Sequence, residues 1–258
     1  MKKSTFTIAL STALVCAVLQ SRPAAAQLKT QTVDYKQADT ALEGYLAYDG
    51  SVAVKRPGIL VVHHRNGLDA FTKSQADKLA YLGYVVFAAD IFGKGVMPKD
   101  TKEAEEQSTK YNKDRPLMRA RAQAGLDWMR ANPMIDMTRI ATVGYCFGGT
   151  VVFELAHTGA PVVGTVSIHG SFRDFTPGAA KNINGRVLIL HGAEDPVAPL
   201  SEVDLVVKEL RHTKVDWQLE LYIGTQHGFT MPTDAANVRA NVPSWAATQK
   251  FFAEVFKN

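Results

Sequence analysis

Continuous apolar runs alternate with segments of helical spacing along most of the chain. Residues 58–63 are apolar at consecutive positions, as expected for a strand buried on both faces of a sheet. Residues 31–48 predict two extended segments around Gly44, in an antiparallel hairpin at the sheet edge. Further strands are predicted at 84–90, 140–143, 162–168, 187–190 and 217–223. Helices are predicted between them, at 71–82, from 114 to 129, at 150–157, from 201 to 210 and at 244–256.

Local signals indicate where several helices begin and end. Gly83 ends the first helix, and Asp114 with Pro116 opens the next long one. Ser201, with Asp204 three residues later, has the spacing of a helix-capping pair.

The alternation of strands and helices predicts an α/β fold with a mostly parallel central sheet and helices on both faces. With 258 residues and no repeat or linker, the chain fits one domain with an ample core. In such sheets, functional residues gather on loops at the carboxyl ends of the strands.

The N-terminal segment has a different pattern, that of a secretory signal peptide. Lys2 and Lys3 precede an apolar run over residues 6–19, and three alanines at 24–26 supply a cleavage site before Gln27. The run is shorter than the roughly 18–20 residues of a spanning helix. We expect residues 1–26 to be removed, residues 27–258 to form the domain, and the protein to be periplasmic or secreted.

Removal of this segment changes the charge and the cysteine count. The remaining chain has 26 basic and 25 acidic residues, a net charge of +1, and no basic cluster that predicts nucleic-acid binding. No other segment is apolar and long enough to cross a membrane. Cys16 leaves with the leader, so Cys146 is the single thiol and forms no internal disulfide. We expect a monomer or a small homo-oligomer.

Cys146 lies in the sequence Gly144-Tyr145-Cys146-Phe147-Gly148-Gly149, between a predicted strand and a predicted helix. This is a cysteine version of the nucleophile elbow, in which glycines flank a sharp strand-to-helix turn. The helix N-terminus favours an anion and lowers a thiol pKa, and the Phe147 amide is placed to donate to an oxyanion. An inert core cysteine is the alternative.

A cysteine nucleophile needs a base and an orienting carboxylate, which follow it in the order acid, then histidine. Asp195 comes after the strand at 187–190, and His227 comes after the strand at 217–223. Glu194 competes with Asp195, but Asp195 before Pro196 better fits the usual H-G-x-x-D-P form. The sequence therefore predicts a triad of Cys146, His227 and Asp195.

The other histidines do not form a metal-binding pattern. His63 and His64 are adjacent, so their side chains point in opposite directions if the strand stays extended, and no carboxylate cluster lies near them in sequence. His191 and His169 lie at strand ends, where we expect a structural role for the first and a place beside the pocket for the second. We therefore expect no metal site among these histidines.

Several motifs together resemble the dienelactone hydrolase family. They are G-Y-C-F-G-G at 144–149, A-A-D-I-F-G-K-G at 88–95, L-H-G-A-E-D-P at 190–196 and H-G-F-T-M-P at 227–232. The resemblance implies the α/β-hydrolase fold, hydrolysis of enol esters, lactones or related carboxylic esters through a thioester, and no cofactor. It implies Cys146, Asp195 and His227 as catalytic residues, with an oxyanion hole formed by the amides of Phe147 and Arg65.

The chain departs from the family pattern at positions that bear on the thiol and the substrate. His64 stands where the family has a glutamate beside the thiol, and an imidazole there would stabilise a thiolate at rest. Lys94 matches one of the family's two carboxylate-binding arginines, while Gly228 and Met231 replace its serine and the other arginine. These changes weaken the case for an anionic dienelactone as substrate.

The sequence thus predicts a hydrolase of a small-molecule ester or lactone, with apolar contacts from Tyr145, Phe92, Phe229 and Met231. Two alternatives stay open. One is a broader exported carboxylesterase or polyester hydrolase with the same triad, and the other is a non-hydrolytic thiol sensor or binding protein that uses Cys146.

Overall fold

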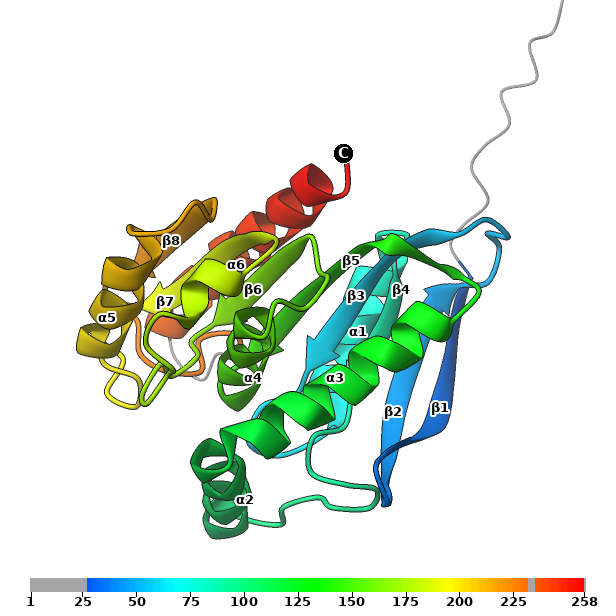
Figure 1. Ribbon diagram of the computed structural model, residues 1–258, viewed down its shortest axis with the longest axis horizontal. Helices are drawn as coiled ribbons and strands as arrows, with labels where there is room; N and C mark the ends of the chain where they lie inside the picture. The colour runs from blue at the N-terminus through cyan, green and yellow to red at the C-terminus, as the bar shows by residue number, and fades with distance from the viewer. Residues whose placement is uncertain (1–26, 232–234, 258) are drawn as a thin grey trace, which may run out of the picture.

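The computed structural model describes residues 27–231 and 235–257, so the expected signal peptide of residues 1–26 lies outside them. An eight-stranded sheet forms the centre of the molecule, in the order β1-β2-β4-β3-β5-β6-β7-β8 (Figure 1). The strands are β1 (Leu28–Gln37), β2 (Thr40–Asp49), β3 (Arg56–Val62), β4 (Val85–Ala89), β5 (Ile135–Tyr145), β6 (Gly164–Ile168), β7 (Arg186–Gly192) and β8 (Trp217–Tyr222).

The sheet is parallel from β4 to β8, and β2 joins it antiparallel to β4 with β1 at the edge. This confirms the predicted mostly parallel sheet. In the centre, Val62 of β3 pairs with Gly144 of β5, and Gly144 also pairs with Ser167 of β6. The carboxyl ends of these three strands therefore lie side by side.

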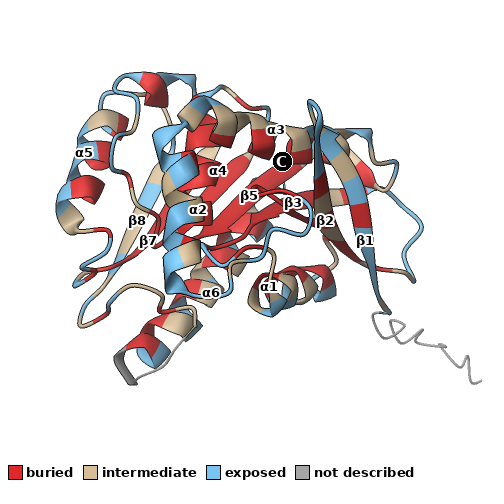
Figure 2. Cartoon of the chain, turned by 90° about the horizontal axis from the view of Figure 1, so that it is seen from below, coloured by how far each residue is buried: buried red, intermediate tan, exposed pale blue. Residues whose placement is uncertain are grey.

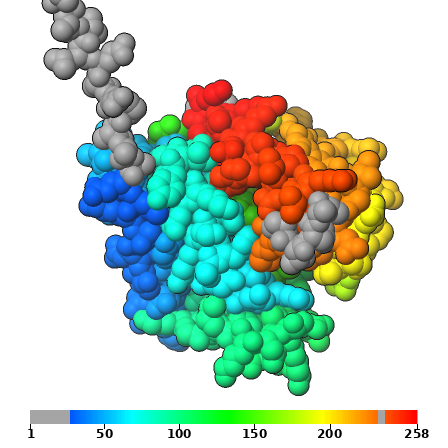
Figure 3. Space-filling view, turned by 180° about the vertical axis from the view of Figure 1, so that it is seen from behind, coloured from blue at the N-terminus to red at the C-terminus, as the bar shows by residue number. Residues whose placement is uncertain are grey.

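Helices cover both faces of the sheet, as predicted. They are α1 (Ala70–Tyr81), α2 (Thr101–Lys113), α3 (Arg115–Ala131), α4 (Phe147–His157), α5 (Leu200–Leu210) and α6 (Ala235–Val255). Helices α1 and α6 pack on one face and make up much of the surface seen in Figure 3. Helices α3, α4 and α5 pack on the other face. Helix α2 lies beyond the carboxyl ends of the central strands (Figure 2).

The continuous apolar strands divide their side chains between two core layers. In β3, Leu60 and Val62 pack with α3 and α4, whereas Ile59 and Val61 pack with α1 and α6. Successive side chains of a strand point to opposite faces, so a strand covered on both sides must be apolar at every position. Figure 2 shows this as a buried central sheet between two layers of helices.

The edge hairpin forms, but its turn is not at Gly44. The turn is at Ala38 and Asp39, because Gln37 pairs with Thr40. Gly44 lies inside β2, where an added Cβ would collide with the ring of Phe87. This glycine therefore serves a close approach between β2 and β4 rather than a turn.

Two further helix predictions need correction. Helix α5 begins at Leu200 after Pro199, without a side-chain cap, so Ser201 is not its N-cap. Helix α2 was not predicted, because it is mostly polar and buries only Ala104 and Tyr111. Among the described residues, no helix combines the length and the apolar character that crossing a membrane requires.

Candidate active site

The turn at Cys146 joins β5 to α4 in a strained conformation. Cys146 has φ 54° and ψ −119°, a region that residues with a side chain seldom occupy. A Cβ on Gly144 would collide with the backbone of Gly148, and one on Gly148 would collide with the carbonyl of Val62. Only glycine at these two positions lets α4 start this close to β3 and β5, which places the thiol above the carboxyl end of the sheet.

Three side chains from separate strand ends meet at this turn. Nε2 of His227, on the loop after β8, lies 3.0 Å from Sγ of Cys146. Nδ1 of the same ring lies 2.7 Å from Oδ2 of Asp195, on the loop after β7. The structure therefore brings together the three residues that the sequence singled out, in the order thiol, imidazole, carboxylate.

The carboxylate of Asp195 is held by its own loop. Its Oδ1 accepts hydrogen bonds from the amides of Val197 (2.8 Å) and Ala198 (2.9 Å), which leaves Oδ2 for His227. The competing acid, Glu194, instead accepts a hydrogen bond from the Gly224 amide at 3.0 Å. The geometry thus selects Asp195 over Glu194 as the partner of the imidazole.

The electrostatics of the pair favour a thiolate beside an imidazolium. Burial acts to raise the pKa of the Cys146 thiol, but hydrogen bonds from His227 and the Phe147 amide, with the charges of His227 and Arg65, outweigh it and lower the pKa. Burial acts to lower the pKa of His227, but its bonds to Asp195 and Cys146 raise it to about 9. A thiol of lowered pKa is a reactive nucleophile at neutral pH.

Comparison with known proteins places this arrangement in a family. The family model described as "Dienelactone hydrolase family" matches residues 42–256. The chain belongs to the dienelactone hydrolase family. Among solved structures of the family type, the one titled m3DLH has 35% identity and a TM-score of 0.85, and covers 89% of this chain and 99% of that one.

Two other relatives extend the comparison. A dienelactone hydrolase-like promiscuous phosphotriesterase from metagenomic libraries has 34% identity and a TM-score of 0.84, over 89% of this chain and 99% of that one. The carboxymethylenebutenolidase homolog of Rattus norvegicus is 27% identical over 159 residues, which are 61% of this chain and 64% of that protein. Membership of this family, together with these relatives, indicates that the protein is a hydrolase.

The oxyanion hole formed by the amides of Phe147 and Arg65 stays a prediction, and the structure shows where each residue lies. Phe147 is the first residue of α4, where amides have no partner within the helix, and its amide bonds to the sulfur. Arg65 lies on the loop after β3, which packs against the start of α4 because the carbonyls of Val62 and His63 face Gly148. The side chain of Arg65 is exposed, and its charge reaches the thiol.

His64, on this loop, has its own carboxylate partner. Its Nε2 lies 2.9 Å from Oδ2 of Asp69, and its ring meets that of Phe71 edge-on at 5.4 Å. The groups that lower the thiol pKa are His227, Phe147 and Arg65. The expected effect of His64 on the thiol stays a prediction, which alkylation against pH in a His64→Ala variant tests.

The cation expected to bind a substrate carboxylate has other partners. Nζ of Lys94 lies 2.7 Å from both carboxylate oxygens of Asp34 and 3.7 Å from Glu43, both on the edge hairpin. Two carboxylates of the hairpin therefore already pair with the cation. Met231, on the His227 loop, is half-buried, and its amide donates to the Gly228 carbonyl.

Three aromatic residues expected around the pocket belong to the core instead. Tyr145 packs in the layer under α1 and α6, where burial raises the pKa of its phenol. Phe92 packs against the rings of His63 and Phe147. Phe229 is fully buried and packs against His169 at 5.0 Å. Apolar residues after strand ends resemble pocket residues in sequence, and only the packing separates the two.

One buried histidine, His169, forms hydrogen bonds beside the triad that its sequence position did not predict. Nδ1 of His169 lies 3.0 Å from the amide nitrogen of Cys146, and Nε2 lies 3.0 Å from Oγ1 of Thr230. His191, by contrast, binds the Ala198 carbonyl at 2.7 Å and supports the Asp195 loop, as expected of a structural residue. The only signal for His169 in the sequence was its place after a strand.

A metal ion could be held by the ligand atoms of Cys146, His169 and His227, which lie within 4.8 Å of one another. However, both ring nitrogens of His169 are already hydrogen-bonded, so a metal would have to displace one of those bonds. His63 likewise uses both nitrogens, as a donor to the His64 carbonyl and an acceptor from the Ile91 amide. The His63–His64 pair therefore does not converge on a common point.

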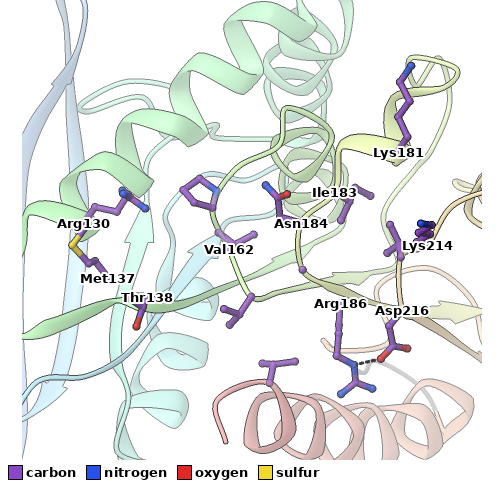
Figure 4. A pocket seen from close by; sticks show the side chains of 15 residues that line it. Arg130, Met137, Thr138, Val162, Lys181, Ile183, Asn184, Arg186, Lys214 and Asp216 are labelled. Atoms are coloured by element: carbon purple, nitrogen blue, oxygen red, sulfur yellow. Dashed lines mark ion pairs between the residues drawn. The ribbon is translucent and has the colours of Figure 1, made fainter. Parts of the chain in front are cut away.

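A hollow of about 850 Å³ opens at the amino ends of the parallel strands, the end of the sheet opposite the triad (Figure 4). Its lining includes Val163, Gly185 and Asp216, which immediately precede β6, β7 and β8. Arg186 pairs there with Asp216 at 2.6 Å. The triad residues follow the carboxyl ends of their strands, so this hollow is remote from them.

Proposed function

We propose that this protein hydrolyses carboxylic esters or lactones through a thioester on Cys146. The observation that carries the proposal is that the His227 imidazole contacts Sγ of Cys146 at 3.0 Å and the Asp195 carboxylate at 2.7 Å, at the start of α4. Such a set is the minimum for nucleophilic acyl transfer.

In the acylation step, the Cys146 thiolate attacks the carbonyl carbon while His227 holds the proton taken from the thiol. The negative charge that develops on the carbonyl oxygen is stabilised by the amides of Phe147 and Arg65. The C–O bond to the leaving group breaks, and the His227 imidazolium gives its proton to the departing alkoxide or enolate. The products are a thioester on Cys146 and the released alcohol or enol.

In the deacylation step, neutral His227 takes a proton from water, and the resulting hydroxide attacks the thioester carbonyl. The same amides hold the second oxyanion. The C–S bond breaks, the carboxylic acid leaves, and the thiolate–imidazolium pair is restored. Asp195 keeps His227 in one orientation through both steps.

The groups near the thiol favour activated esters, enol esters and lactones that do not depend on a bound carboxylate. A thiolate expels good leaving groups readily and amides poorly. The Lys94 ammonium, which an anionic dienelactone would use, is already paired with Asp34 and Glu43. We therefore expect neutral substrates to be preferred.

Hydrolysis of p-nitrophenyl acetate and butyrate, with a panel of lactones, tests the proposal. The wild-type chain should release p-nitrophenol, and Cys146→Ala and His227→Ala should lose about 10³-fold or more in kcat/KM. Intact-mass measurement during turnover should show one acyl group, which is absent in Cys146→Ala. Full activity in Cys146→Ala would refute the proposal, and no turnover of any ester would favour a thiol sensor or binding protein. Turnover of insoluble polyesters would instead favour the broader esterase.

A second candidate reaction is hydrolysis of aryl phosphotriesters. It rests on the relative titled a promiscuous phosphotriesterase, which is 34% identical over 89% of this chain. A thiolate that attacks a carbonyl can also attack phosphorus when the leaving group is a phenolate. Release of p-nitrophenol from a diethyl aryl phosphotriester, lost in Cys146→Ala, would support this activity. Its absence alongside ester hydrolysis would exclude it.

A further inference from the structure

His169 directly follows β6 in a conformation that is costly for a residue with a side chain. Its φ is 41°, and its side chain is fully buried. Strain of this kind persists only where the surroundings fix the residue in place. Its ring packs edge-on against His227 at 4.9 Å and against Phe229 at 5.0 Å between centroids.

The two ring nitrogens of His169 make different hydrogen bonds. The amide of Cys146 can only donate, so Nδ1, 3.0 Å away, must accept and carries no proton. The same amide also donates to the Ile168 carbonyl at 2.9 Å. In the neutral ring the proton is then on Nε2, which donates to Oγ1 of Thr230 at 3.0 Å.

These two bonds join the nucleophile turn to the loop that carries the base. Thr230 follows His227 by three residues on that loop, and its carbonyl accepts a hydrogen bond from Asn241 of α6 at 3.0 Å. His169 therefore lies between the backbone of Cys146 on one side and the His227 loop on the other. A shift of either segment would break one of its bonds.

A protonated His169 would not fit this position. Protonation of Nδ1 would break the bond from Cys146 and place a second positive charge beside the His227 imidazolium. Burial, first, and then the charge of His227 keep the pKa of His169 well below its ordinary value. The ring therefore stays neutral while its neighbour carries the charge.

We propose that His169 is a positioning residue for the thiolate–imidazolium pair, acting as a neutral Nε2–H imidazole that fixes Cys146 and the His227 loop relative to each other. The proposal rests on the function proposed above. It concerns how the 3.0 Å contact between Cys146 and His227 is maintained, and not a group that touches the substrate.

Variants that remove the bonds one at a time test this role. Asparagine tolerates positive φ and offers Oδ1 near the position of Nδ1, so His169→Asn keeps the Cys146 bond and loses the Thr230 bond. Thr230→Val loses the same bond from the other side. We expect each to lower kcat/KM by about tenfold, and the double variant to lose no more than either single one. His169→Leu loses both bonds and should lower kcat/KM by about 100-fold.

The thiol pKa separates positioning from a merely structural role. The alkylation rate against pH should give a higher apparent pKa in His169→Leu than in the wild type, with a partial shift in Thr230→Val. Full additivity in the double variant, or wild-type pH profiles in both Thr230→Val and His169→Leu, would overturn the proposal. A loss of thermal stability alone would not produce the pKa shift.

Nitrogen-15 NMR of the histidine side chains tests the tautomer in the wild-type chain. The wild-type ring signals that disappear in His169→Asn belong to His169. They should show a proton on Nε2 and no titration between pH 5 and 9. A proton on Nδ1, or titration in that range, would contradict the proposal even if His169→Leu does not fold. Alkylation and NMR need no substrate, so failure of the wild type to hydrolyse esters would reject the proposed function without deciding this inference.

Discussion

The histidines around Cys146 have the same side chain but opposite pKa shifts, and their partners account for the difference. Burial lowers the pKa of His169 and of His191, whose bonds are to an amide, a hydroxyl or a carbonyl. His227 is half-buried, but a carboxylate at 2.7 Å and a thiolate at 3.0 Å outweigh its desolvation. A general base is therefore created by two anionic neighbours within a shell of neutral rings.

The dependence of His227 on Asp195 gives a matched pair of variants. Asp195→Asn removes the carboxylate charge and offers an amide where His227 needs an acceptor, so we expect kcat/KM to fall by about 10³–10⁴-fold. The neighbouring side chain of Glu194 accepts a hydrogen bond from the Gly224 amide and does not contact His227 among the described residues. Glu194→Gln should therefore change kcat/KM by less than about threefold. Steady-state ester hydrolysis measures both. Equal losses in the two variants would contradict the assignment of Asp195.

The pKa shifts of Cys146 and His227 predict how reactivity depends on pH. The thiolate–imidazolium pair exists above the lowered pKa of the thiol and below the His227 pKa of about 9. Alkylation by iodoacetamide should therefore reach its plateau at lower pH than that of a free thiol. Hydrolysis of an alkyl ester, whose leaving group needs a proton, should decline above about pH 9, while alkylation stays on its plateau.

His227→Ala serves as the control for both curves, because it removes the imidazolium. Its alkylation plateau should move to higher pH, and the decline of hydrolysis near pH 9 should disappear with the activity. An unchanged alkylation curve in this variant would mean that the thiolate does not depend on His227.

The sequence predicted the three residues of the candidate triad because each follows a recognisable strand, and parallel strands bring their carboxyl ends to one edge. It did not predict the engagement of His169, which depends on a loop about 60 residues later that folds back to place Thr230 against it. Nor did it predict the ion pairs of Lys94, because the hairpin that supplies Asp34 and Glu43 precedes it by 51 residues or more. Local motifs predict the strand ends, whereas side-chain partners depend on distant chain segments.

At the scale of elements, α1 and α2 begin with the same cap but in different surroundings. Asp69 accepts a hydrogen bond from the Thr72 amide at 3.0 Å, and Asp100 accepts one from the Glu103 amide at 2.8 Å. Asp69 in addition pairs with the buried imidazole of His64. One carboxylate thus starts a helix and also satisfies the loop next to the nucleophile turn.

This difference predicts unequal losses of stability in the two alanine variants. Asp100→Ala removes a cap alone and should lower the free energy of unfolding by about 1 kcal/mol. Asp69→Ala also leaves a buried ring nitrogen without its partner, and should lower it by about 2–4 kcal/mol. Urea unfolding at neutral pH compares them. A similar loss in both variants would mean that the His64 pair adds nothing to the cap.

The elements that the sequence predicted poorly share a physical cause. Ser201 and Asp204 have the spacing of a capping pair, but α5 starts one residue earlier, at Leu200, and its first-turn acid Glu202 accepts hydrogen bonds from the side chain of Ser171 and the amide of Phe172. Gly44 has the composition of a turn, but serves the close packing of Phe87. In each case a tertiary contact decides between two local structures that the sequence allows.

At the scale of the whole molecule, the sheet separates two regions of different character. The carboxyl edge carries the strained turn, the buried imidazoles and the acid loop, with α2 beyond them. The amino edge carries an open hollow in which Arg186 is neutralised by Asp216 and by Glu254 at 3.0 Å. The direction of the strands fixes where the loops after β5, β7 and β8 converge. Strand direction therefore locates the candidate active site here, whereas cavity size points to the other end of the sheet.

The N-terminal segment makes a prediction about the mature molecule. Residues 1–26 have the basic start, the apolar run and the small residues of a signal peptide, so we expect export and cleavage before Gln27. In the structure the Gln27 amide bonds to Asp49 at 2.9 Å, so the residue that cleavage would leave at the N-terminus contacts the folded domain. Intact-mass measurement of the chain recovered from the periplasm of a Gram-negative host should give residues 27–258, with a net charge of +1.

A Lys2→Glu/Lys3→Glu variant, which loses the basic start, should accumulate uncleaved in the cytoplasm. Recovery of the full-length wild-type chain from the cytoplasm alone would reject export, and it would place the thiol of Cys146 in a reducing compartment rather than an oxidising one.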